Sequence, residues 1–63
     1  MTSFLGTQIG RMAEVEFSVN GETVIKNGYI DIVGENYIVM SNPENNSTIL
    51  CDNENIKFIT FYD

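Results

Sequence analysis

Asn20 and Gly21 stand between two runs of alternating apolar and polar residues, and this pair most constrains how the chain can fold. An Asn-Gly pair supplies the two positive-φ positions of a type I′ turn, whose twist matches that of two antiparallel strands. On the N-terminal side of the pair, Val15, Phe17 and Val19 alternate with polar residues, as expected for a half-buried strand. The sequence therefore predicts a β-hairpin that reverses at residues 20 and 21.

Counting outward from this turn gives the register of the hairpin. The predicted pairs are Val19 with Glu22, Phe17 with Val24, and Val15 with Lys26. The same count continues the inner face through Gly28, Ile30 and Ile32, and it turns Ile25, Tyr29 and Asp31 outward.

Two residues do not fit this count: Ile25 would point outward beside Glu16, and Lys26 would lie on the inner side near the end of the sheet. We expect a β-bulge near Asn27 and Gly28, because glycine tolerates the left-handed conformation of a bulge and allows a long strand to bend sharply.

The next reversal leaves two registers open. A type II′ turn centred on residues 34 and 35 would place Tyr37 and Val39 on the inner face, and this register is preferred. A three-residue turn would bring Ile38 and Met40 inward instead.

The two ends of the chain complete the predicted elements. Residues 2–9 are expected to form one short helix whose apolar side chains dock on a larger surface: Phe4, Leu5 and Ile9. After a polar loop that contains Pro43, residues 48–52 and 56–62 predict a fourth and a fifth strand.

A chain of 63 residues is too short for a second hydrophobic core, so we predict a single domain over residues 1–63. Five short strands with so little helix cannot leave an apolar sheet face uncovered, and the sheet must curl. The predicted fold is therefore mainly β: a small five-stranded antiparallel barrel with a short N-terminal helix.

This pattern resembles the Sm-like family of SH3-type barrels, and small bacterial Sm-like proteins in particular. The resemblance covers nearly the whole chain and rests on three stretches: SFLGTQIGRMAEVEF, NGYIDIVGENYIVM and NIKFITFY. It implies the SH3-like (Sm-like) barrel, with a short helix before five bent strands. It also implies that the fourth strand of one subunit could pair with the fifth strand of the next, giving a homo-oligomer.

The RNA-binding motifs of the Sm-like family are matched only in part. Gly28, with Ile30, Ile32 and Val33 after it, matches the start of the first motif, and Asn36 is an approximate match to its base-contacting asparagine. Cys51-Asp52 stands where the family has an Arg-Gly-type pair. Because an aspartate there repels phosphate, the resemblance does not carry RNA binding to this chain.

The residue types offer little for catalysis. There is no histidine, and a serine or cysteine nucleophile would need another base, for which Lys26 and Lys57 are weak candidates. Residues 52–55 are like the start of a calcium loop but lack the glycine and the bidentate glutamate that complete one. We expect a protein that is not an enzyme and has no catalytic, metal-binding or cofactor-binding residues.

Nine acidic and three basic residues give a formal charge of −6, which opposes both a phosphate backbone and an anionic membrane surface. Nucleic acid and membrane are therefore disfavoured as direct partners. The lone Cys51 cannot close an internal disulfide and is interpreted as a small core residue. With no apolar leader in the sequence, we expect a cytoplasmic protein.

Three hypotheses of function remain. The preferred one is a small non-catalytic structural or protein-interaction module, which self-assembles or docks a protein partner through a strand edge or a tyrosine-bearing face. Its predicted partner-binding residues are Tyr29, Tyr37, Ile56, Phe58 and Tyr62. The first alternative is an acidic inhibitor that mimics nucleic acid, and the second is an Sm-like RNA-binding ring. The mimic would use Glu14, Glu16, Glu22, Asp31, Glu35 and Glu44.

Overall fold

The computed structural model describes residues 2–62, with side chains described from Phe4 onward. The elements are α1 (Thr2–Gly6), β1 (Met12–Val19), β2 (Glu22–Val33), β3 (Tyr37–Asn42), β4 (Ser47–Asp52), the short 3₁₀ helix η1 (Asn53–Asn55) and β5 (Ile56–Tyr62). The five strands form one antiparallel sheet in the order β4-β3-β2-β1-β5. The predicted mainly-β fold, with five antiparallel strands after a short helix, is confirmed.

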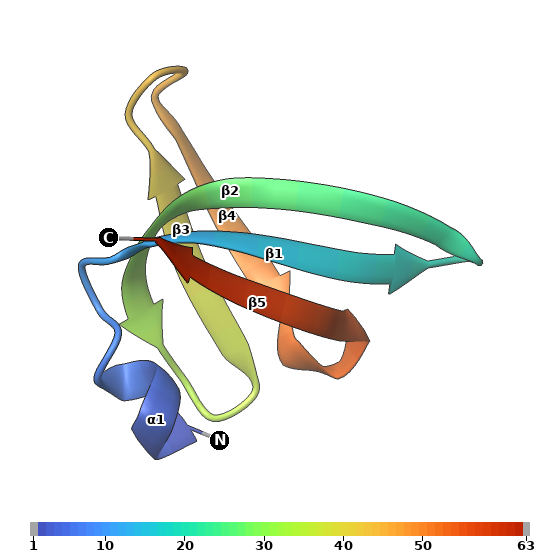
Figure 1. Ribbon diagram of the computed structural model, residues 1–63, viewed down its shortest axis with the longest axis horizontal. Coiled ribbons are helices and arrows are strands. Elements are labelled where there is room, and N and C mark those ends of the chain that lie inside the picture. Colours follow the sequence, from blue (N-terminus) through green and yellow to red (C-terminus); the bar gives the residue numbers. More distant parts are fainter. Residues whose placement is uncertain (1, 63) are drawn as a thin grey trace.

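The sheet curls because β2 belongs to two halves of it. The first part of β2 pairs with β1 as far as Tyr29, and its last part, from Tyr29 to Val33, pairs with β3. Figure 1 shows the consequence: β1, β5 and the first part of β2 run together, and the β3–β4 hairpin crosses behind them. Strands β4 and β5 stand at the two ends of the strand order, so each leaves one edge unpaired by the other described strands.

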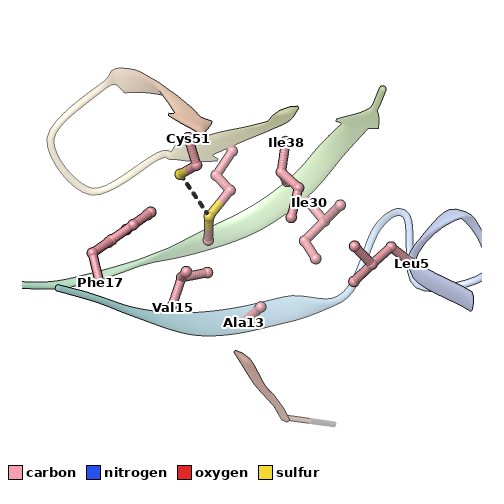
Figure 2. Packing of buried hydrophobic residues seen from close by; sticks show 8 residues of the cluster. Leu5, Ala13, Val15, Phe17, Ile30, Ile38 and Cys51 are labelled. Carbon is pink, nitrogen blue, oxygen red and sulfur yellow. Dashed lines mark hydrogen bonds between the residues drawn. The ribbon is translucent and has the colours of Figure 1, made fainter. Parts of the chain in front are cut away.

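The core lies between these two halves of the sheet (Figure 2). Its buried residues are Leu5, Ala13, Val15, Phe17, Ile30, Ile38, Met40 and Cys51. No polar or charged side chain of the described residues is buried among them. The Cys51 thiol lies 3.8 Å from the Met40 sulfur, and both sulfur atoms are inside this apolar core.

The predicted hairpin is confirmed in its turn and in its register. Asn20 has a φ of 50° and Gly21 a φ of 79°, as a type I′ turn requires. Val19 pairs with Glu22, Phe17 with Val24 and Val15 with Lys26. Val19 was expected on the inner face but is 45% exposed, because the end of the hairpin extends beyond the core.

The predicted bulge near Asn27 and Gly28 is wrong. The β1–β2 register continues without a shift past both residues, and the irregularity falls between Ile30 and Ile32, where β2 pairs with β3. Beyond this shift, each residue of β2 points to the opposite side of the sheet from the side given by the count from the hairpin. Ile32, which was expected inside, is therefore 53% exposed.

Gly28 has a steric role at the bend of β2. A Cβ at this position would lie 2.6 Å from the main-chain oxygen of Ser41 on β3. A residue with a side chain would push the two strands apart, so glycine permits the close approach.

The preferred register of the β2–β3 turn is also wrong, and the alternative is confirmed. A three-residue connection over 34–36 separates the strands, and Val33 pairs with Ile38. Ile38 and Met40 are fully buried, whereas Tyr37 is 43% exposed.

The N-terminal helix is shorter than predicted, and only one of the three apolar side chains of the predicted segment is buried. It ends at Gly6, and a turn secured by the Gly10 N–H, which donates to the Ile30 carbonyl at 2.7 Å, leads into β1. Leu5 is buried in the core, but Phe4 and Ile9 are more than half exposed, contrary to expectation. Within residues 2–62, no helix has the length and apolar character needed to span a membrane.

Candidate interaction surface

The face of β2, β1 and β5 that points away from the core presents three cross-strand rows of side chains. These rows project outward because the intervening residues of β1, which include Ala13 and Val15, are buried. The rows are Tyr29–Met12–Tyr62, Asn27–Glu14–Thr60 and Ile25–Glu16–Phe58. These nine residues are called the outer face below.

The outer face combines exposed apolar side chains with two central carboxylates. Tyr29 and Tyr62 are 39% and 48% exposed, and Ile25 and Phe58 are 53% and 64% exposed. Such a concentration of aromatic and aliphatic surface on one face is typical of interaction sites, where aromatic residues and methionine are enriched. Glu14 and Glu16 lie between these apolar groups on the central strand of this half.

Three of the five predicted partner-binding residues share the outer face: Tyr29, Phe58 and Tyr62. The other two lie elsewhere. Tyr37 pairs with Asp52 of β4, and its ring covers Gly34, where an added Cβ would overlap it. Ile56 is half-buried against the core. The structure therefore brings together the predicted residues of β2 and β5 but places Tyr37 on the other half of the sheet.

Met12, which sequence reasoning did not select, stands at the centre of the tyrosine row. It pairs with Tyr29 on one side and with Tyr62 on the other. The pairing of Met12 with Tyr29 follows from the hairpin register, which is counted outward from the turn at residues 20 and 21. The second depends on the pairing of β1 with β5, for which the sequence has no connecting turn.

A second exposed apolar row crosses the other half of the sheet. Ile32, Val39 and Leu50 pair across β2, β3 and β4, and Leu50, on the edge strand, is 72% exposed. This row gives the β4 edge an apolar side chain beside its unpaired main chain.

A hollow of about 260 Å³ lies between α1 and β5. Its walls are mainly apolar and include Phe4, Leu5, Ile59 and Phe61. The side-chain oxygen of Asn53 at this hollow is buried and has no hydrogen-bond partner among the described residues. Phe4 also meets the Phe61 ring edge-on at 6.1 Å, which helps to hold α1 against β5.

The described acidic residues are spread over several elements of the fold and do not form one cluster in the strand order. Asp52 caps η1, since its Oδ1 accepts a hydrogen bond from the Glu54 N–H at 3.0 Å. The aspartate at this position therefore has a local structural role. The residues of the nucleic-acid-mimic hypothesis occur on β1, on β2 and in two connections. No cluster of three or more potential metal ligands occurs among residues 2–62.

Burial raises the pKa of the Cys51 thiol above its ordinary value of 9.0, and the positive charge of Lys26 opposes this effect in part. Lys26 lines the same hollow as Phe17 and Cys51, so its predicted position on the inner side of the hairpin is confirmed at the rim of the core. Because the folded-state pKa is the higher one, the contribution of the neutral thiol to stability is complete below about pH 9 and is lost as the pH rises further.

We expect the Cys51 thiol of the folded protein to react with a chromogenic disulfide reagent at pH 8 at least about tenfold more slowly than in urea-unfolded protein. Cys51 is 2% exposed, and burial disfavours its thiolate. The absorbance of the released chromophore measures the rate. Equal rates in the folded and the unfolded protein would show that the thiol is open to solvent.

Comparisons with known proteins give no relative: no family model matches the chain, and no curated protein matches it. The Sm-like resemblance therefore stays a prediction. What the fold and the surface define is a small mainly-β domain with an exposed aromatic face.

Proposed function

We propose that this protein is a small non-catalytic interaction module, which self-assembles or docks a protein partner through its outer face or a strand edge. The observation that carries the proposal is the outer face itself. Tyr29, Tyr62 and Phe58 come from two strands that flank β1, and all three are at least 39% exposed on the same side of the sheet. Exposed tyrosines give a partner large contact area for little loss of side-chain entropy.

The strand edges support the same proposal. A sheet edge offers unpaired main-chain N–H and C=O groups, to which a strand from a partner or a second copy can be added. β5 carries Phe58 on the outer face beside its edge, and β4 carries Leu50. A strand added at either edge would thus gain apolar contacts in addition to main-chain hydrogen bonds.

A photo-crosslinking amino acid at position 58 tests the proposal in cells that produce the protein. We expect discrete adducts from position 58, because the Phe58 side chain is 64% exposed on the outer face and belongs to the edge strand β5. The same crosslinker at position 35, an exposed residue of the β2–β3 connection, is the control and should give much weaker adducts. The mass of an adduct tells a second copy of the chain from another protein. Equal labelling from both positions, or none from either, would contradict the proposal.

A further inference from the structure

One end of the outer face is hollowed into a groove of about 500 Å³. Its apolar surface comes from Tyr29, Met12 and Tyr62, which form one cross-strand row, and from Pro43 in the β3–β4 loop. Residues that face each other across neighbouring strands have Cβ atoms about 4.5–5.5 Å apart, so Met12 spaces the two tyrosines on either side of it.

The β3–β4 loop is shaped to hold an acidic residue beside these rings. The Asn42 side-chain oxygen accepts a hydrogen bond from the Glu44 N–H at 3.0 Å, and Pro43 between them has a fixed φ. Asn46 takes a positive φ of 57° and returns the chain into β4. Glu44 thus lines the groove from a turn that is already formed without a partner.

The charged side chains that line the groove among the described residues are all negative. Glu14 contributes a second carboxylate, and no lysine or arginine lines the groove. Within the described part of the chain, the carboxylates of Glu14 and Glu44 have neither a hydrogen-bond nor an ion-pair partner. A neighbouring hollow that shares Tyr29 and Pro43 adds Asp31 and again no cation.

The three basic residues of the chain are placed elsewhere. The Arg11 guanidinium lies over the Phe61 ring, 5.6 Å from its centre. Lys26 lines the hollow beside Cys51, and Lys57 lines the hollow between α1 and β5. Within residues 2–62, no side chain therefore supplies a positive charge that would complement the groove.

We propose that this groove binds an arginine side chain on an exposed segment of a protein partner, with the guanidinium against the tyrosine rings and its charge facing Glu14 and Glu44. Arginine suits the site better than lysine, because its planar group stacks on aromatic rings while its N–H groups donate to carboxylates. A phosphate or carboxylate ligand would be repelled, and a purely apolar ligand would cover two carboxylates without compensation. This inference rests on the proposed function and names the chemistry of its partner.

A capped Gly-Gly-Arg-Gly-Gly peptide, titrated into isotopically labelled protein and followed by amide chemical shifts, tests the inference. We expect the largest shifts at Met12, Tyr29, Glu44 and Tyr62. The same peptide with citrulline in place of arginine keeps the shape of the side chain and removes its charge, so it should bind far more weakly. Equal binding of the two peptides would overturn the inference.

Two double variants separate the groove from the general negative charge of the protein. Glu14→Gln with Glu44→Gln should weaken binding about fivefold, and Tyr29→Leu with Tyr62→Leu should do so by a similar factor while keeping apolar area. Glu22→Gln with Glu35→Gln removes the same charge outside the groove, and it should change the affinity less than twofold. Equal losses in the two glutamine variants would overturn the inference in favour of non-specific attraction.

The inference and the proposed function can fail separately. If the crosslinker at position 58 captures a partner equally well in the wild type and in the Glu14→Gln, Glu44→Gln variant, the arginine site is wrong and the interaction module stands. If no adduct forms in the wild type, the interaction module itself is wrong.

Discussion

Gly28→Val is expected to lower the free energy of unfolding by at least about 3 kcal/mol, a large share of the stability of so small a domain. The Cβ alone would lie 2.6 Å from the Ser41 oxygen and 3.1 Å from the Ser41 carbonyl carbon. Both are main-chain atoms of β3, so the clash is relieved only by separating β2 from β3 at the bend. Urea denaturation followed by circular dichroism measures the loss.

Asn27→Val is the matched control for this substitution. It introduces the same side chain at the adjacent position, where Asn27 is exposed on the outer face. Valine favours strands, so we expect a change within about 0.5 kcal/mol. A Gly28→Val protein with the denaturation midpoint of the wild type would show that the two strands do not approach closely at this bend.

The β1–β2 hairpin was predictable because its determinants are local. The Asn20-Gly21 pair specifies the turn, the turn specifies the register, and the alternation of β1 then specifies which side is buried. Ala13, Val15 and Phe17 follow this rule, and Val19 departs from it only because the end of the hairpin extends beyond the core. Every step uses residues within a few positions of one another.

The path of β2 beyond Tyr29 was not predictable in the same way. The shift between Ile30 and Ile32 is a property of the β2–β3 pairing. In the sequence, Gly28 indicated a bulge at its own position and Gly34 indicated a type II′ turn. Gly28 has the residue type that bulges favour, but its role is to admit the Ser41 main chain. A glycine in a strand thus signals either a bulge or a close approach, and the sequence alone does not tell which.

The outer face was predictable in its residue types but not in its extent. Tyr29, Phe58 and Tyr62 were selected as partner-binding residues, yet their proximity depends on β1, which pairs with both strands. The β1–β5 register also shifts between Glu16 and Phe17, beyond the Glu16–Phe58 pair, so counting back along β5 from Tyr62 would wrongly place Ile56 on the outer face. Glu44 reaches the groove from the β3–β4 loop, and only the curl of the sheet places that loop beside the tyrosines.

The inner and outer faces of the same half of the sheet should differ sharply in their contribution to stability. Phe17→Ala is expected to lower the free energy of unfolding by about 3–5 kcal/mol, since it removes an aromatic ring from the core beside Cys51 and leaves a cavity (Figure 2). For a domain of this size, the melting temperature should fall by about 12 °C or more. Differential scanning calorimetry measures both quantities.

Phe58→Ala removes the same ring from the outer face, where Phe58 is 64% exposed and only its contacts along the sheet are lost. We expect this variant to melt within a few degrees of the wild type, at about 1 kcal/mol or less. The pair of variants thus separates residues that hold the fold from residues left free to meet a partner. If Phe17→Ala melted as high as Phe58→Ala, the burial of the β1 inner face would be wrong, and the outward direction of the tyrosine row, which follows from it by alternation, would fall as well.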